Sequence, residues 1–321
     1  MILELGPDHR YDITHRALVM GILNRTPDSF FDGGQYFDFD GFLAKAAGLV
    51  AGGADFLDVG GVKAGPGPEV GTEEELERVV PAVAALRERF DVPISVDTWN
   101  PVVLRAALEA GAVVGNDISG FAAPDYLPIC AEFGASVVAT HIRLGPRIPD
   151  PEPVYDDLCA EVRGFLADRA RMAIDAGIPR RRIMVDDGLD LGKTEPQSLE
   201  LLRTSDQLAS LGYAAFLSAS NKRFLGELLG LDVAERREAS HAAHVVGISL
   251  GCRILRAHDV RGARRTADLV AELLERRADR SERPGHSSDQ TGHRGGNADR
   301  EVTSAEGERS DSGARASEDA V

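Results

Sequence analysis

Short apolar runs alternate with stretches of helical periodicity along most of this chain. Eight runs rich in β-branched and other apolar residues are separated by segments with apolar residues at every third or fourth position. These runs lie at 17–23, 55–59, 92–97, 112–116, 135–141, 182–186, 214–219 and 252–257. Helical spacing is clear in 158–170 and 267–274. The segment Thr72–Glu75 resembles a capping box and predicts the start of another helix.

This alternation predicts an α/β fold. Eight strands alternating with helices over about 250 residues are typical of a (β/α)₈ (TIM) barrel. An open, doubly wound sheet gives a similar alternation and is the alternative fold. The pattern stops near residue 279, and 280–321 is rich in Gly, Ser, Asp, Glu and Arg. We therefore expect a barrel domain over 1–279 and a disordered polar tail over 280–321, because such a segment buries too little apolar surface to offset its ordering entropy.

A polar or ionisable residue stands at or near the end of every predicted strand. In chain order these residues are Asn24, Asp58, Asp97, Asn116 with Asp117, His141, Asp186, Ser220 with Lys222, and Arg256 with His258. A single such residue is usually a solvated loop or capping group. Eight in succession would converge on one mouth of a barrel, where barrel enzymes build their active sites. The pattern therefore predicts an enzyme with its site at that mouth.

Charge and composition limit the kinds of partner and of cellular location that we expect for this chain. The chain has 321 residues and a formal net charge of -16, which disfavours non-specific nucleic-acid binding. Its three cysteines are widely spaced, so a disulfide framework or zinc site is not expected and a reducing cytoplasm fits. The sequence opens without a signal-peptide pattern and contains no apolar stretch of about 18 residues, so no membrane span is predicted.

Six segments resemble the motifs of one enzyme family. The run Met-Gly-Ile-Leu-Asn-Arg-Thr-Pro-Asp-Ser-Phe-Phe-Asp-Gly-Gly at 20–34 is similar to the first signature of dihydropteroate synthases. Five later segments resemble further motifs of that family: Ile94–Thr98, Asn116–Ile118, Val185–Lys193, Ser220–Arg223 and Arg256–Val260. Their order and spacing agree across residues 17–260. The resemblance implies a transferase of folate biosynthesis that condenses 6-hydroxymethyl-7,8-dihydropterin diphosphate with p-aminobenzoate, commonly as a homodimer.

The chemistry of a pterin fits four residues of these motifs. A pterin presents a 2-amino group beside a ring N–H, and a carboxylate accepts that pair through two hydrogen bonds. Asp97 and Asp186 suit this role, and the resemblance implies that they bind the pterin. Asn116 can donate and accept, and Lys222 can donate to ring acceptors.

The diphosphate leaving group needs positive charge and hydrogen-bond donors. Arg256 carries a planar fork suited to phosphate oxygens, and His258 lies two residues further on. Asn24 offers an amide oxygen to Mg²⁺, the metal expected to accompany a diphosphate. The resemblance implies that Asn24, Arg256 and His258 bind the diphosphate, and that Arg256, His258 and Lys222 are the catalytic residues.

The second loop departs from the family pattern. Dihydropteroate synthases usually read D-x-G-G-E-S-T-R-P-G there, whereas this chain has Val62-Lys63-Ala64-Gly65 in place of Glu, Ser, Thr and Arg. Lys63 could supply a positive charge from a shifted position, but not a planar fork. Asn221 also replaces an Arg, and Asp187 and Asp190 replace a Pro and a Gly.

The altered loop leaves two alternatives open. One is a weak or inactive pterin-binding paralogue, similar to the divergent second copies found beside a conventional synthase in some actinobacteria. The other is a pterin-dependent methyltransferase-type domain, which would not need a diphosphate site at Arg256 and His258.

Overall fold

Eight parallel strands close into a barrel in the computed structural model of this protein, which describes residues 1–25, 39–65 and 67–281. The barrel order is β10-β3-β4-β5-β6-β7-β8-β9, with β10 paired to both β3 and β9. The barrel strands are β3 (Leu18–Asn24), β4 (Phe56–Gly60), β5 (Ile94–Asp97), β6 (Val114–Asp117), β7 (Ser136–Thr140), β8 (Ile183–Asp186), β9 (Ala214–Leu217) and β10 (Ile254–Ala257). Each lies within, or one residue beyond, one of the eight predicted runs, and closure rules out the open sheet.

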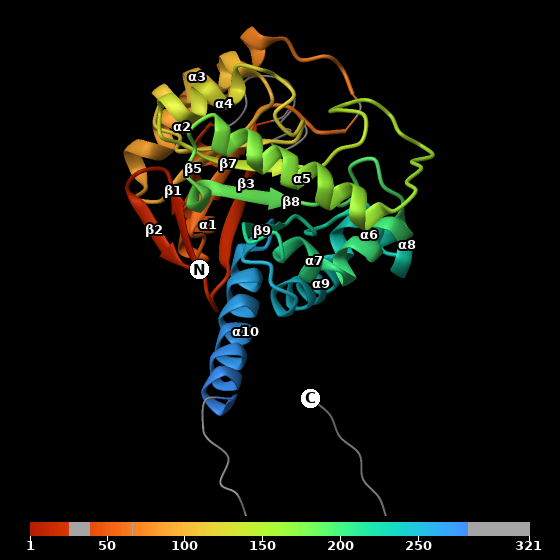
Figure 1. Cartoon of the computed structure of the whole chain (residues 1–321). Helices are drawn as coiled ribbons and strands as arrows, with labels where there is room; N and C mark the ends of the chain where they lie inside the picture. The colour runs from red at the N-terminus through yellow and green to blue at the C-terminus, as the bar shows by residue number, and fades with distance from the viewer. Residues whose placement is uncertain (26–38, 66, 282–321) are drawn as a thin grey trace, which may run out of the picture. The chain divides into compact units, whose positions relative to one another are not determined.

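Helices follow the strands and surround the barrel (Figure 1). They are α1 (Phe39–Ala51), α2 (Thr72–Arg89), α3 (Pro101–Glu109), α4 (Tyr126–Glu132), α5 (Leu158–Asp175), α6 (Glu195–Arg203), α7 (Ser205–Ala209), α8 (Arg223–Leu229), α9 (Arg237–Ser249) and α10 (Val260–Ser281). Two short 3₁₀ helices, η2 (Arg180–Arg182) and η3 (Val233–Glu235), lie in connections. The predicted helices at 158–170 and 267–274 are confirmed as parts of α5 and α10.

The capping box predicted at Thr72 is wrong. The N-cap of α2 is Gly71, and no side chain caps the helix. Thr72 instead accepts a hydrogen bond from Asn100 Nδ2 (2.8 Å), and Glu75 accepts one from the Thr98 hydroxyl (2.6 Å). A partner on the neighbouring β5–α3 connection therefore holds the glutamate that the local pattern assigned to the helix end.

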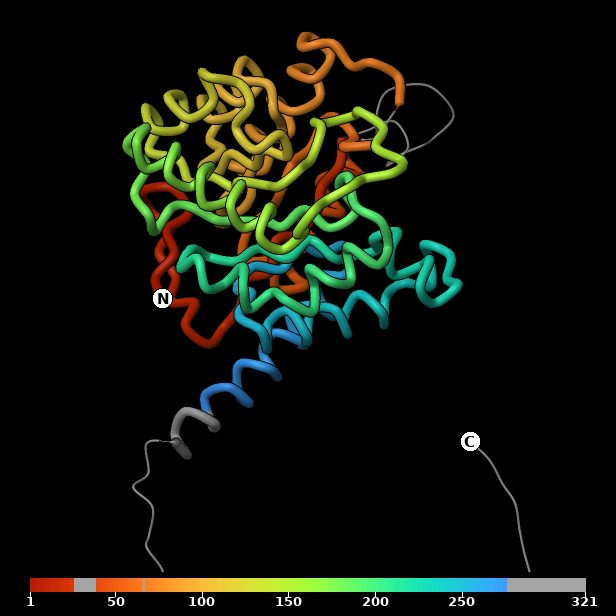
Figure 2. The backbone as a smooth tube through the Cα atoms, turned by 45° about the vertical axis from the view of Figure 1, so that its right-hand side comes forward, coloured from red at the N-terminus to blue at the C-terminus, as the bar shows by residue number. Residues whose placement is uncertain are grey.

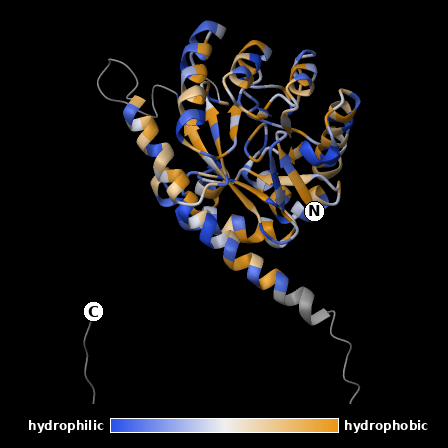
Figure 3. Cartoon of the chain, turned by 90° about the vertical axis from the view of Figure 1, so that its left-hand side faces the viewer, coloured by the Kyte–Doolittle hydropathy of each residue, from blue (hydrophilic) through white to orange (hydrophobic). Residues whose placement is uncertain are grey.

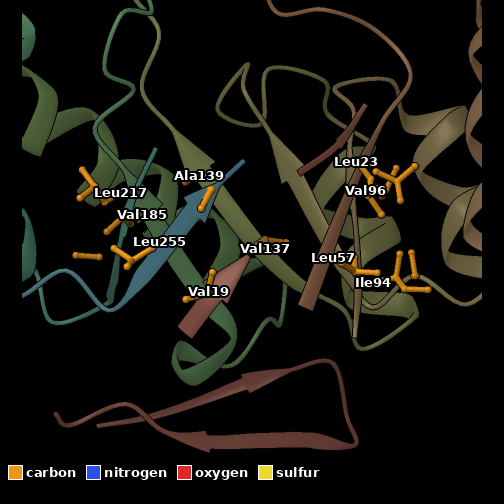
Figure 4. Close-up of a cluster of buried hydrophobic side chains, with 14 of the residues drawn as sticks. Val19, Leu23, Leu57, Ile94, Val96, Val137, Ala139, Val185, Leu217 and Leu255 are labelled. Atoms are coloured by element: carbon orange, nitrogen blue, oxygen red, sulfur yellow. The ribbon is translucent and has the colours of Figure 1, made fainter. Parts of the chain in front are cut away.

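Strand parity divides the apolar residues into two cores. Side chains that point outward, such as Val19, Leu57 and Val96, pack between the barrel and the helices (Figure 4). Those that point inward fill the lower barrel: Leu18, Met20, Phe56, Val114, Val138, Met184, Ala214, Phe216 and Ile254. Hydropathy follows this division, with mostly hydrophobic strands inside helices of mixed character (Figure 3). The upper barrel is left to polar side chains.

A hairpin that was not predicted covers the lower end of the barrel. Strands β1 (Ile2–Leu5) and β2 (His9–Asp12) pair antiparallel, and Leu3, Leu5 and Ile13 join the inward-facing core. The Ser136 hydroxyl fixes the hairpin by accepting from Gly6 N (2.9 Å) and donating to the Glu4 carbonyl (2.7 Å). Each strand has only four residues, which is too short for a clear period in the sequence.

The last described helix, α10, runs beyond the barrel body (Figures 1 and 2). Contacts along the chain define one compact unit from Met1 to Glu282, close to the predicted boundary at 279. Of the predicted tail over 280–321, residues 280–281 end α10 and 282–321 lie outside the described residues. No helix in the described part is long and apolar enough to cross a membrane.

The hairpin should contribute to the stability of the whole barrel. Leu5 is fully buried, so Leu5→Ala should lower the free energy of unfolding by about 2–5 kcal/mol in urea titrations, through lost apolar burial and a residual cavity. Val154→Ala, at a side chain that is 74% exposed, is the matched control and should change it by less than about 0.5 kcal/mol. Equal effects of the two substitutions would show that the hairpin is not part of the cooperative core.

Candidate active site

Strand parity brings the predicted pterin-binding residues to one place. Asn24, Asp97 and Asn116 are joined by the register of the barrel, which pairs Asn24 with Gly60, Gly60 with Asp97, and Asp97 with Asn116. Along its own strand, each of these residues lies an even number of positions from a residue that faces the barrel interior. Because side chains alternate between the two faces of a strand, each of the three faces the interior as well. Asp117, one residue further, faces outward and accepts hydrogen bonds from the backbone N–H groups of Ser119 and Phe121.

Arg256 links two carboxylates inside the mouth. Its Nε donates to Asp58 Oδ2 (2.7 Å) and its Nη2 donates to Asp97 Oδ2 (2.9 Å). Asp58 is fully buried and also accepts from Asn116 Nδ2 at 3.2 Å. One guanidinium therefore ties together strands β10, β4 and β5, and Asp58 orients the amide of Asn116.

The shared cation leaves negative charge in excess. Burial raises the pKa of Asp97 to about 7, with Asp58 acting in the same direction and Arg256 opposing the shift. Asp58 and Asp97 share the single positive charge of Arg256, which cannot neutralise two buried carboxylates. Asp97 is thus poised between its charged and neutral forms near neutral pH.

A second group of charges lies at the ends of β8 and β9. Asp186 ends β8, and its Oδ1 accepts a hydrogen bond from Gly188 N (2.8 Å). Lys222 is the N-cap of α8, and its Nζ donates to the Leu189 carbonyl (3.0 Å). Burial raises the pKa of Asp186 and lowers that of Lys222, and the opposite charge of each partly offsets these shifts.

A pocket brings most of the predicted site residues together. Asp97, Asn116, Asp186, Lys222 and Arg256 all line it, so the four residues predicted for the pterin share one cavity. The other lining residues are Ala64, Ile118, Thr140, Gly188, Leu191, Phe216 and Ser218. Carboxylates opposite a buried amide and an ammonium group can bind a flat heterocycle that has both donors and acceptors on its edge.

His258 lies beside this pocket and faces a neighbouring cavity. Its backbone N–H donates to Ser220 Oγ (3.1 Å), and the same oxygen is hydrogen-bonded to His258 Nδ1 at 3.0 Å. In its neutral form the ring carries one N–H donor and one acceptor nitrogen. Burial and the nearby cations Arg256, Lys45 and Lys222 lower the pKa of His258 to about 4, so the ring is neutral at neutral pH.

The second loop presents different residues from those expected. Lys63 is exposed, whereas its neighbour Ala64 lines the pocket and Val62 is buried. Of the first signature, Met20 to Asn24 lies in β3, and Arg25 donates its backbone N–H to the Gly60 carbonyl (2.7 Å). The remainder of that motif, Thr26 to Gly34, lies outside the described residues.

Two buried charges at the site were not assigned a role from the sequence. Asp58 holds Arg256, and Lys193 donates to His141 Nδ1 (3.0 Å) and to the carbonyls of Gly188 and Leu191. The inward parity of Asp58 relative to Phe56 could have revealed its role. Lys193 has no strand-parity signal, because its partners come from a folded loop, but it ends the motif at Val185–Lys193.

A family model for pterin-binding enzymes matches residues 20–258, the segment that contains every one of these groups. The chain belongs to the pterin-binding enzyme family. Within it, the chain is similar to dihydropteroate synthases. It is 37% identical over 269 residues to the dihydropteroate synthase of Streptococcus pyogenes, covering 83% of this chain and 98% of that protein.

Another relative in this family differs in its described activity. The inactive dihydropteroate synthase 2 of Mycobacterium leprae is 41% identical over 266 residues, covering 80% of this chain and 91% of that protein.

Solved structures of the family share the fold. The dihydropteroate synthase of Yersinia pestis in complex with a sulfonamide drug superposes with a TM-score of 0.80 at 34% identity, covering 86% of this chain and all of that one. The Xanthomonas albilineans enzyme with 4-aminobenzoic acid gives a TM-score of 0.76 at 38% identity, covering 84% and 96%. The predicted family and barrel fold are therefore confirmed.

Asp97 should leave a signature in the pH dependence of stability. Its pKa is raised in the folded state, so the folded protein binds a proton that the unfolded chain releases between about pH 4 and 7. The free energy of unfolding should therefore fall as pH rises through this range, by up to about 1.4 kcal/mol per pH unit from this group. Urea titrations at several pH values should show a shallower fall for Asp97→Asn, and an unchanged slope for the exposed control Asp91→Asn. An unaltered slope in Asp97→Asn would contradict the shared-cation account.

Proposed function

We propose that this protein is a dihydropteroate synthase-like transferase that joins a dihydropterin diphosphate to p-aminobenzoate. The observation that carries the proposal is the single pocket lined by Asp97, Asn116, Asp186 and Lys222 in a chain of the pterin-binding family. The alignment with a related dihydropteroate synthase covers 98% of that protein, and one solved relative is a complex with 7,8-dihydropteroate.

In this proposal the pocket binds and orients the pterin. Asp186 accepts the 2-amino group and ring N–H, while Asn116 and Lys222 meet the remaining polar edge. Asp97 and the carboxylates around it stabilise positive charge that develops on the pterin as the diphosphate leaves. The amine nitrogen forms the C–N bond as the C–O bond breaks, the diphosphate leaves with the bonding pair, and the proton that the amine loses passes to solvent. No covalent enzyme intermediate is required.

The diphosphate is proposed to lie toward Asn24, Arg256 and His258. The neutral ring of His258 carries one N–H, which suits a phosphate oxygen. A Cβ built at Gly60 would lie 3.6 Å from both Asn24 Oδ1 and Asp97 Oδ2, so an amide and a carboxylate oxygen flank this point. Such oxygens fit Mg²⁺, which is usually held by one or two carboxylates together with substrate phosphates and would neutralise the leaving group. Among the described residues, no cluster of three His, Cys, Asp or Glu could hold a metal without that substrate.

A second candidate function is pterin binding without synthesis. It is favoured by the similarity to the inactive protein of M. leprae and by the position of Ala64, which lines the pocket where the family pattern has Thr. A pterin site of this kind would remain intact while the p-aminobenzoate site is altered.

One experiment separates the two functions. We expect dihydropteroate and free diphosphate from purified protein given the pterin diphosphate, p-aminobenzoate and Mg²⁺, with weak turnover caused by the altered loop. Ala64→Thr combined with Gly65→Arg should raise kcat/KM by about 10- to 100-fold, since a hydrogen bond to a charged group contributes about 1.5–3 kcal/mol. Among the described residues, no atom lies within 4 Å of a Cβ built at Gly65, so a side chain can begin there without a clash with them.

The matched control is Gly164→Arg, at another open glycine, on the outer helix α5. It should leave turnover unchanged. Pterin binding by calorimetry without product in either the native or the Thr–Arg protein would refute the synthase and support the second candidate. Absence of both binding and product would refute both.

We also propose that the protein is a homodimer. Large apolar side chains are exposed on two adjoining helices: Val245 and Val246 on α9, and Leu269 (64% exposed) and Leu273 (55%) on α10. Exposed apolar surface of this kind supports a protein interface.

We propose a cytoplasmic location as well, which suits the free, buried thiols of Cys130 and Cys252.

Light scattering coupled to size-exclusion chromatography tests the dimer. The native chain should elute at twice the monomer mass, and Leu269→Glu with Leu273→Glu should shift it to the monomer, because two buried carboxylates at an interface are costly. Leu228→Glu, on α8, controls for a general effect of surface charge. A native monomer would rule the proposal out.

A further inference from the structure

A second cavity lies next to the pterin pocket, between the ends of β9 and β10 and the start of α9. Its volume is about 370 Å³, and it is lined by Ser220 and Asn221 after β9, by His258 and Asp259 after β10, and by Arg237, Ser240, His241 and His244 of α9. Val233 and Ala234 of η3 complete its rim. We name it the histidine cavity. His258 lines it, so the cavity adjoins the proposed diphosphate position.

The cavity contains a buried histidine whose hydrogen bonds are unmet. His244 is 1% exposed, and neither of its ring nitrogens has a hydrogen-bond partner among the described residues. Burial lowers its pKa to about 3, so the ring is neutral and offers one N–H donor and one acceptor. A buried polar group without a partner is costly, so this arrangement indicates a ligand or ordered water in the cavity.

One guanidinium and one carboxylate line the cavity, and further positive charge lies behind its His258 wall. Arg237 stands at the rim with a side chain that is 70% exposed, and its Nε lies 3.7 Å from Asp259 Oδ2. Asp259 is already engaged, because it accepts from Gly262 N (3.0 Å) and pairs with His241 Nε2 (3.1 Å). The other wall, at His258, feels the positive charge of Arg256, Lys45 and Lys222.

The position of the cavity points to phosphate chemistry. Barrel enzymes often bind phosphate with the loops after their seventh and eighth strands, which here are β9 and β10. The helix α9 begins at the cavity, and its N-cap, Arg236, provides no side-chain cap for the first N–H groups. A metal centre is a poorer explanation, since no metal-binding cluster of three occurs in the described parts of the chain.

We propose that the histidine cavity is a second anion subsite, in which Arg237, the first turn of α9 and His258 bind the diphosphate once it has left the pterin. The origin of the diphosphate from the pterin rests on the proposed function, whereas the binding of diphosphate by the cavity does not. The C–O bond breaks at the pterin pocket, and the diphosphate carries the bonding electron pair with it. A subsite on the far side of His258 separates it from the carbon that the amine attacks.

Calorimetry with inorganic diphosphate tests the subsite without any turnover. Arg237→Gln should weaken diphosphate binding about tenfold, the loss typical of one charge-assisted hydrogen bond. Ala234→Phe should weaken it to a similar extent by filling the rim while keeping every charge. Arg203→Gln, at a side chain that is 74% exposed on α6, is the matched control and should bind as the native protein does.

The affinity for 6-hydroxymethylpterin should be unchanged in all three variants, which distinguishes a lost subsite from a misfolded barrel. Native affinity for diphosphate in both Arg237→Gln and Ala234→Phe, or no binding by the native protein, would overturn the proposal. If the protein forms no dihydropteroate but the two variants still lose diphosphate affinity, the subsite stands and the synthase reaction is what fails.

Discussion

The pairing of Arg256 with Asp58 and Asp97 is the interaction on which the mouth of this barrel depends. It joins β10 to β4 and β5 through hydrogen bonds of 2.7 and 2.9 Å in a largely buried setting. Removing one partner from such a buried pair is strongly destabilising, because the remaining charge loses its compensation. The same arrangement leaves Asp97 near its point of titration and fixes the amide of Asn116, so structural and chemical roles are combined in one triad.

This triad also changes how the diphosphate region should be understood. Arg256 is committed to two carboxylates, and so it is not simply a free fork waiting for phosphate. The polar side chains of the histidine cavity include His258, which is hydrogen-bonded to Ser220, and Arg237. Positive charge is thus distributed from the pterin pocket into the histidine cavity. This arrangement complements the altered second loop, where Ala64 and Gly65 contribute no charge.

Prediction from the sequence succeeded for features that depend only on the periodicity of apolar residues and the order of motifs along the chain. The eight strands, the residues at their ends and the family followed from apolar runs and from motifs such as Asn116–Ile118. Prediction failed where a partner lies far along the chain. Glu75 was assigned to a helix cap but accepts from Thr98, and the short β1–β2 hairpin acquires its strand character from packing under the barrel. Asp58 was noted as a strand-end residue without its role as the partner of Arg256, 198 positions away.

The sequence by itself determined the barrel, the family and the set of polar residues that reach its mouth, because strand parity and short-range pattern are local properties. Only the tertiary structure decided which pocket each of those residues lines and which charges it pairs with. Closure of β10 against β3 and β9 placed Arg256 in the lining of the pterin pocket and His258 in the lining of the histidine cavity. Burial and charge pairing then set their protonation, and both depend on distances that exist only after the chain has closed on itself.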